Sequence, residues 1–166
     1  VPADHFGLVL WGHATGWLPG GYSHDIMQVS VSSRQNLNTR YMGLDGTPNE
    51  ATTSPLIEID ALAKLLPDHV ADYIWFDACL MGMWEVAEAC APFADYALFS
   101  EETEPDGGWD YEAIFNFLAG NPDATAQDIG ETAITSYHNS GNDYSTLSMV
   151  DLSGLPTLRT AIDAMA

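Results

Sequence analysis

The stretch Tyr73-Ile74-Trp75-Phe76 is the feature that most limits how this chain can fold. Four consecutive aromatic and β-branched residues, followed at once by the small-residue segment Asp77-Ala78-Cys79, predict a buried strand that ends in a turn. A second apolar stretch, 6–11, ends in the same manner at Gly12-His13-Ala14. Because ligands bind beyond the carboxyl ends of the strands in open α/β sheets, both turns are candidate functional positions.

Strand and helix patterns alternate along most of the chain. Strands are predicted at 6–11, 73–78, 96–99 and 145–150, and helices near 58–66, 83–91, 110–119, 125–138 and 154–165. Thr125 and Asp128 have the spacing of a capping box. The segment 18–56 has little periodicity, which predicts a long loop or a pair of irregular strands. We therefore expect one α/β domain over 1–166, with a mostly parallel sheet flanked by helices.

The charge balance is strongly acidic, with 4 Lys and Arg against 24 Asp and Glu and a net charge of −20 at pH 7. Such a chain lacks the basic patches needed to bind nucleic acid or an anionic membrane. It would attract cationic ligands, including basic peptides and divalent metals, although the same charge is also explained by surface solubility alone. No apolar run is long enough to cross a bilayer.

One of the two turns contains the thiol of Cys79 and the other contains the imidazole of His13, which are the groups that a cysteine hydrolase needs. Cys79 precedes a predicted helix, whose N-terminus would favour a thiolate, and His13 could serve as the general base and proton donor. The alternative is structural, with Cys79 a small buried hydrophobic residue and His13 a satisfied turn residue. Cys90 lies roughly 15 Å further along the helix, beyond the ~7 Å reach of a disulfide, and is expected in the core.

The turns belong to longer motifs. These are Trp11-Gly12-His13-Ala14-Thr15-Gly16-Trp17, Phe76-Asp77-Ala78-Cys79-Leu80-Met81, Ser100-Glu101-Glu102-Thr103-Glu104-Pro105 and Gly108-Trp109-Asp110-Tyr111. On these motifs the chain resembles the clostripain-like family of cysteine peptidases, which belongs to one structural clan with the caspases and gingipains. The segment 145–152 also looks like a strand of that family, and the resemblance is weakest over 18–56.

The resemblance implies a caspase-like three-layer sandwich and an endopeptidase that cleaves after basic residues, Arg in preference to Lys, through a thioester. It implies Cys79 as the nucleophile and His13 as its partner, with the backbone amides of Ala14 and Cys79 as oxyanion donors. It also implies an acidic pocket formed by Asp77 and Asp106, which would pair bidentately with guanidinium. From the residues alone, the alternative is that each aspartate is a turn residue that hydrogen-bonds to the backbone.

Further implications concern maturation, location and metal. The family commonly matures by cleavage between the histidine and cysteine strands, where Arg34 and Arg40 are candidate points. Its members are usually exported by bacteria, so an extracytoplasmic or secreted location is expected. The sequence requires no cofactor. Glu101, Glu102 and Glu104 form a solvated edge, line the site or bind Ca²⁺, although no calcium-loop spacing is present.

Two departures from the family pattern support an alternative. Ala14 replaces a family Gly, and a left-handed backbone there would cost Ala about 1 kcal/mol more than Gly. In addition, the family's core strand before the histidine strand is not supplied, so we expect an amino-terminal strand and further carboxy-terminal sequence to be lacking. The alternative is a catalytically silent module that binds basic peptides or a divalent metal. The sequence leaves the oligomeric state open.

Overall fold

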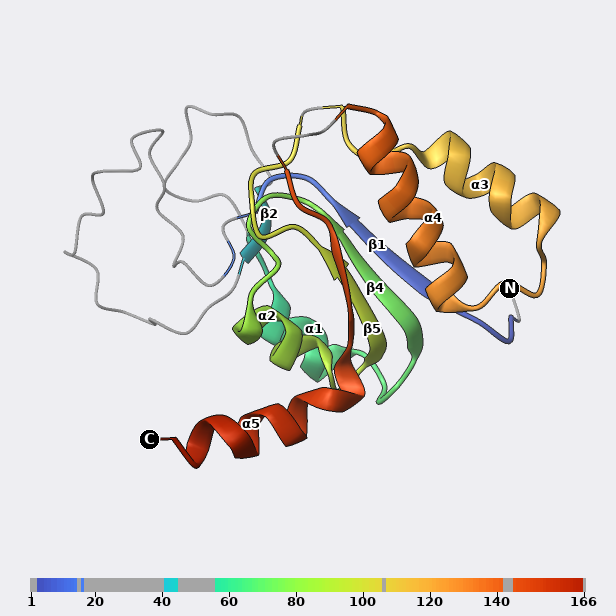
Figure 1. The fold of residues 1–166 in the computed structure, drawn as a ribbon. Coiled ribbons are helices and arrows are strands. Elements are labelled where there is room, and N and C mark those ends of the chain that lie inside the picture. Colours follow the sequence, from blue (N-terminus) through green and yellow to red (C-terminus); the bar gives the residue numbers. More distant parts are fainter. Residues whose placement is uncertain are drawn as a thin grey trace.

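The central sheet has four strands in the order β1-β4-β5-β6 (Figure 1). The computed structural model describes residues 3–14, 16, 41–44, 56–105, 107–141 and 145–165. The strands are β1 (Gly7–Trp11), β4 (Ala71–Asp77), β5 (Ala94–Phe99) and β6 (Ser148–Asp151). Strands β1, β4 and β5 are parallel, whereas β6 runs antiparallel to β5. The prediction of an α/β fold with a mostly parallel sheet is confirmed.

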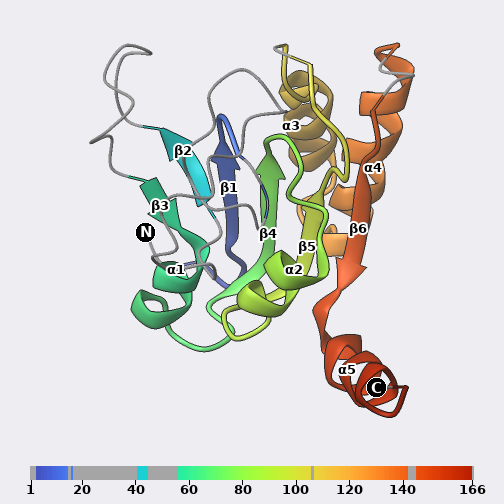
Figure 2. The ribbon, with the colours of Figure 1, turned by 90° about the vertical axis from the view of Figure 1, so that its left-hand side faces the viewer.

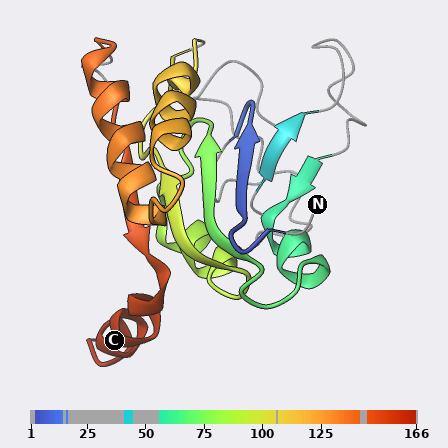
Figure 3. The same ribbon diagram turned by 90° about the vertical axis from the view of Figure 1, so that its right-hand side faces the viewer.

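Helices cover both faces of this sheet. Helices α1 (Ile59–Leu65) and α2 (Trp84–Cys90) lie on one face, and α3 (Tyr111–Gly120) and α4 (Ala126–Asn139) lie on the other (Figures 1 and 2). After β6, a short η1 (Leu152–Gly154) leads into α5 (Leu155–Asp163), which extends beyond the end of the sheet (Figure 3). The result is a three-layer arrangement, as expected.

Strand β4 explains why the apolar run 73–76 is continuous rather than alternating. A strand in the middle of a parallel sheet is buried on both faces. Ile74 and Phe76, each 0% exposed, pack in the cluster under α1 and α2, while Trp75, 2% exposed, packs in the cluster under α3 and α4. Cys90 is also 0% exposed within the first cluster, and the two cysteines are not joined by a disulfide, as predicted.

The weakly periodic region contains one pair of short strands in its described part. Strands β2 (Tyr41–Leu44) and β3 (Leu56–Glu58) pair antiparallel, with a register shift between Met42 and Leu44. The remainder of 18–56 lies outside the described residues, so the prediction for this region is confirmed only for these strands. The missing amino-terminal strand stays a prediction.

The predicted start of helix α4 is confirmed by its hydrogen bonds. The Thr125 hydroxyl accepts a hydrogen bond from the Asp128 amide at 3.2 Å, and the Asp128 carboxylate accepts one from the Thr125 amide at 2.9 Å. This is the predicted capping box of α4. Among the described residues, no helix has both the length and the apolar character needed to cross a membrane.

Candidate active site

The predicted nucleophile and histidine follow neighbouring parallel strands at equal distances. Trp11, the last residue of β1, is in register with Asp77, the last residue of β4, and the Gly12 amide donates to the Asp77 carbonyl at 3.2 Å. His13 and Cys79 each lie two residues beyond this matched pair. His13 is exposed and Cys79 is half-buried. The fold therefore brings both residues to the same edge of the sheet, on adjacent strand ends.

The segments that follow these two residues also pack together. Gly16 is buried and has a φ of +63°. A Cβ at this position would lie only 2.4 Å from the Leu80 carbonyl oxygen and 2.7 Å from the Met83 sulfur. Only glycine fits both the conformation and the space. The turn after the histidine is thus seated directly on the turn after the cysteine.

The hydrogen-bond partner of the thiol comes from the segment after β5, not from a helix. The Glu104 amide donates to the Cys79 sulfur at 3.3 Å, and the Glu104 carbonyl lies 3.9 Å from the same sulfur. Helix α2 begins only at Trp84, with Met83 as its N-cap. Because helix-dipole effects fall off within the first turn, the nearby amide is the better placed group to stabilise a thiolate.

A network of hydroxyl groups holds the segment that carries this amide. Ser100 is 0% exposed, and its hydroxyl interacts with the Thr146 hydroxyl at 3.2 Å. The Thr146 hydroxyl also accepts from the Glu101 amide at 3.0 Å, and the Ser145 hydroxyl donates to the Thr103 carbonyl at 2.9 Å. The chain before β6 therefore fixes residues 100–103, and with them the approach to the thiol.

Asp77 is buried against the loop that precedes α3. It is 3% exposed, and its Oδ2 accepts from the Trp109 amide at 3.2 Å and from the Tyr111 hydroxyl at 2.8 Å. Gly108 has a φ of +66°, and a Cβ there would lie 2.8 Å from the same oxygen. Burial and the nearby Asp77 carboxylate raise the pKa of Tyr111, so its hydroxyl stays a neutral donor.

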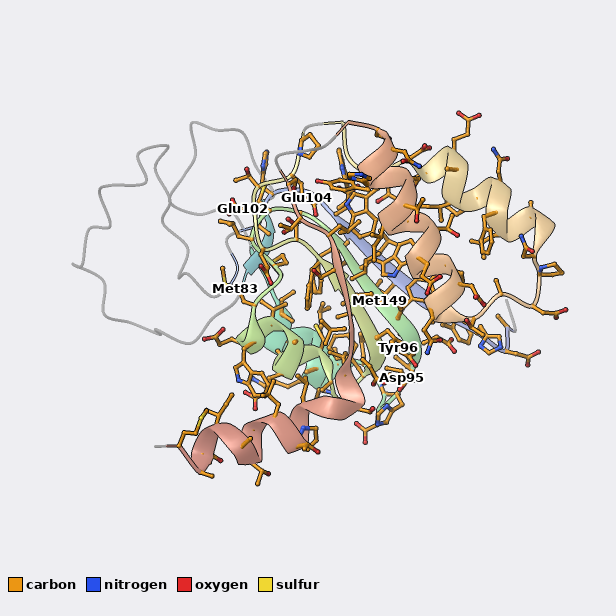
Figure 4. The ribbon with its side chains drawn as sticks, viewed as in Figure 1. Met83, Asp95, Tyr96, Glu102, Glu104 and Met149 are labelled. Atoms are coloured by element: carbon orange, nitrogen blue, oxygen red, sulfur yellow. The ribbon has the colours of Figure 1, made fainter. Side chains whose placement is uncertain are left out.

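Glu104 differs from the other two glutamates of its segment. Glu101 and Glu102 are exposed, as expected for a solvated edge, whereas Glu104 is half-buried. Figure 4 shows Glu102 and Glu104 at the end of the sheet opposite to Asp95 and Tyr96. Glu104 Oε2 accepts from the Trp109 indole N–H at 2.9 Å, and no group of the described residues donates to its buried Oε1. Burial, together with the neighbouring Asp77, raises the pKa of Glu104 to about 8.

The remaining predicted site residues fall into two groups. Ala14 is half-buried, and among the described non-glycine residues only His69 and Leu80 have a positive φ, so Ala14 avoids the left-handed strain considered above. The roles of Ala14 and Cys79 as oxyanion donors stay predictions. The pocket residue Asp106 and the cleavage candidates Arg34 and Arg40 lie outside the described residues.

No metal site emerges from the part of the chain that the structure describes. Within it, no group of three or more His, Cys, Asp or Glu side chains could hold an ion. Binding of Ca²⁺, which the sequence left open, stays a prediction.

Comparison with known proteins agrees with the motifs. A profile of the Clostripain family, peptidase family C11, matches residues 1–166. The chain therefore belongs to the Clostripain family. No match was found among curated proteins.

Solved structures of similar proteins give the same assignment. An inactive zymogen C11 protease from Parabacteroides distasonis is 28% identical, with a TM-score of 0.61 over 95% of this chain and 37% of that one. A secreted C11 cysteine protease from Bacteroides thetaiotaomicron, iotapain, is 26% identical, with a TM-score of 0.64 over 96% and 42%. A clostripain from Bacteroides thetaiotaomicron, in complex with the peptide inhibitor BTN-VLTK-AOMK, is 25% identical, with a TM-score of 0.52 over 69% and 50%. The chain thus spans half or less of the length of these proteins.

The sequence predicted roles for Cys79, His13 and Asp77, which stay predictions. It did not predict the contacts that join Asp77 to Trp109 and Tyr111. It left the role of Glu104 open among three glutamates, and it allowed Trp109 equally as a core or pocket-wall residue or as a substrate platform. In the structure Trp109 is 4% exposed in the core, and its indole N–H holds Glu104. The only available signal was the spacing of Glu104, Trp109 and Tyr111 within one family motif, which does not reveal that all three converge on Asp77.

Proposed function

We propose that this protein is a cysteine endopeptidase that hydrolyses peptide bonds after basic residues, Arg in preference to Lys. The observation that carries the proposal is the placement of His13 and Cys79 two residues beyond the matched ends of adjacent strands. A thiol and an imidazole on neighbouring strand ends are what nucleophilic catalysis on an amide requires. Membership of the Clostripain family supports the same reaction.

The proposed reaction has two stages. His13 takes the proton of the Cys79 thiol, the sulfur attacks the scissile carbonyl carbon, and His13 then returns this proton to the leaving amine. The resulting thioester is hydrolysed by water, which His13 deprotonates, and the thiol is restored. In both stages, the backbone amides of Ala14 and Cys79 would stabilise the oxyanion.

The proposed specificity rests on carboxyl groups beside the thiol that have no cationic partner among the described residues. Asp77 is fixed directly before the nucleophile segment, and Glu104 contacts the sulfur through its backbone. A guanidinium group pairs with a carboxylate bidentately, which favours Arg over Lys. The similar clostripain was solved with an inhibitor whose peptide, VLTK, contains a lysine. Asp106 is retained as a second proposed pocket residue.

Maturation and location follow from the family. We propose cleavage after Arg34 or Arg40, between the two strands that carry the site residues. Because a similar protease from Bacteroides thetaiotaomicron is secreted, we also propose an extracytoplasmic location. Amino-terminal sequencing of the active protein would identify the cleavage point.

The decisive experiment compares hydrolysis of a fluorogenic peptide with Arg before the reporter by wild type, Cys79→Ala and Cys90→Ala. Cys90 is a matched control because it is a buried thiol in the core, away from the strand ends. We expect loss of at least ~10³-fold in Cys79→Ala and retained activity in Cys90→Ala. Equal rates for wild type and Cys79→Ala would refute the proposed nucleophile. Binding of the peptide without hydrolysis by wild type would favour the silent module instead.

A further inference from the structure

Two carboxyl groups beside the thiol are held by the same short loop. The Trp109 amide donates to Asp77 Oδ2 at 3.2 Å, while the Trp109 indole donates to Glu104 Oε2 at 2.9 Å. One tryptophan therefore fixes both carboxyl groups at once. Neither donor carries a charge, so the loop positions the two acids without neutralising them.

The second oxygen of Glu104 lacks a donor. Oε1 is buried, and no N–H or O–H group of the described residues reaches it. A carboxyl group with a buried oxygen that nothing solvates is more costly to bury in its ionised form than in its neutral form. The neighbouring Asp77 carboxyl adds to this effect through its charge and its hydrogen bond with Glu104. The geometry therefore favours a protonated Glu104.

The groups that face Glu104 from other elements do not compete for this role. They are Asp77 on β4, Cys79 after β4, Tyr111 on α3 and Tyr137 on α4. The pKa values of both tyrosines are raised, chiefly by burial, so both remain neutral near pH 7. Burial and Asp77 raise the pKa of Glu104 itself to about 8, which agrees with the argument from contacts.

We propose that Glu104 is a positioning residue that senses the charge of the substrate: it holds a proton in the free protein and releases it to solvent when a basic side chain enters beside Asp77. The inference rests on the proposed specificity for basic residues. A guanidinium or ammonium group stabilises the ionised form of both carboxyl groups, so the proton leaves and the pocket gains one negative charge. The same residue contacts the nucleophile, since its amide donates to the Cys79 sulfur.

The proposal predicts that the affinity for a basic peptide depends on pH, because binding and proton release are coupled. If binding of a cation expels a proton from Glu104, affinity for that cation rises with pH below ~8 and levels off above it. A fixed pair of ionised carboxylates would show no such dependence between pH 6 and 8. A merely structural role for Glu104 would change stability without changing proton release.

Calorimetry on Cys79→Ala tests this directly, because that variant cannot cleave its ligand and has no thiol proton to release. The ligand is a tetrapeptide that ends in Arg, titrated at pH 7 in phosphate and in Tris, whose different ionisation enthalpies yield the number of protons released. We expect more than half a proton per peptide bound. Adding Glu104→Gln should reduce the release to near zero, whereas adding Glu102→Gln, an exposed neighbour, should not change it.

The outcomes separate the two proposals. Binding of the Arg peptide with equal proton release in the Glu104→Gln variant would overturn the role of Glu104 and leave the proposed specificity intact. No preference for the Arg peptide over its neutral citrulline analogue would overturn both. If Glu104→Gln fails to fold, Trp109→Phe serves instead. Loss of the indole donor should favour protonated Glu104 and increase proton release at pH 8.5. Unchanged release would count against the proposal.

Discussion

The two ends of the central sheet both carry carboxyl groups, yet these groups have different partners at the two ends. At the amino ends of the strands, Asp72 and Asp95 are partly exposed, and each lies 2.8 Å from the imidazole of a histidine, His5 or His69. At the carboxyl ends, Asp77 and Glu104 are buried or half-buried, and the donors that reach them from the described residues are all neutral.

The difference identifies which end is built for a ligand. Exposed ion pairs contribute little to stability and are easily replaced. Buried acidic groups without a cation reduce stability, so a fold gains from them only if a positive charge arrives from outside. Of the cationic side chains that the structure describes, Arg159 pairs with Glu88 at 2.8 Å, and Lys64 lies in the last turn of α1. The carboxyl ends of the strands are thus the better candidate to bind a cationic ligand.

The largest expected effect separates the two ends by activity. Asp77→Asn should lower kcat/KM for an Arg substrate by about 10²–10³-fold, because a buried charge that pairs with guanidinium is lost. Asp95→Asn, at the other end, should change kcat/KM by less than about twofold. Steady-state kinetics on both variants would measure this. Similar losses at both ends would contradict the division drawn here.

A smaller effect concerns stability. Tyr111→Phe removes the hydroxyl donor of the buried Asp77 carboxylate, and we expect a loss of about 1–2 kcal/mol in the free energy of unfolding. Tyr96→Phe is the matched control, since its hydroxyl contacts the exposed Gln127 near the amino end. Urea denaturation of both variants would test the contrast. A larger loss in Tyr96→Phe would reverse it.

The pH dependence of stability provides a third comparison. The raised pKa of Glu104, about 8 instead of 4.5, means that the folded protein keeps a proton that the unfolded chain has lost. Stability from this group is therefore lost as pH rises from about 4.5 to 8. Because Glu104 is partly exposed, we expect Glu104→Gln to gain only about 1 kcal/mol at pH 8 relative to pH 5, or ~2–4 °C in Tm. A gain that is equal at both pH values would argue against a buried acid.

The smallest effect is expected at His5. Asp72 raises the pKa of His5 above 6.5, so the stabilisation by this pair is present below that pH and is lost as pH rises through the raised value. We expect His5→Ala to lower Tm slightly at pH 5.5 and to match wild type at pH 8. Thermal melts at both pH values would check this, and a deficit that persists at pH 8 would show a role beyond the ion pair.

Local patterns were sufficient to predict much of the fold. The run 73–76 predicted a strand, and Thr125 with Asp128 predicted the start of α4, because each signal depends on neighbouring residues. The direction of β6 was not predicted, because strand pairing depends on contacts between distant segments. Helix α2 begins at Trp84 with Met83 as its N-cap, as expected, but the sequence did not predict that the Glu104 amide donates to the thiol.

The site was predictable only as far as its motifs reached. Cys79 and His13 follow recognisable strands, so their common edge could be expected. The link from Cys79 to Glu104 and the convergence of Trp109 and Tyr111 on Asp77 depend on how the loop after β5 folds back. The glycine at position 108 permits this approach through its positive φ, which no local pattern distinguishes from an ordinary turn.

The hydroxyl groups of Ser145 and Thr146 have a consequence for engineering. They tie residues 100–103 to the antiparallel strand, which is the strand furthest from His13 in the sheet order. The segment before β6, at the other side of the sheet, therefore helps to fix the position of the loop whose Glu104 amide contacts the Cys79 sulfur. An insertion or a proteolytic cut just before β6 would therefore lower the activity without altering Cys79 or His13. A ligand-binding segment inserted there would make the activity depend on that ligand.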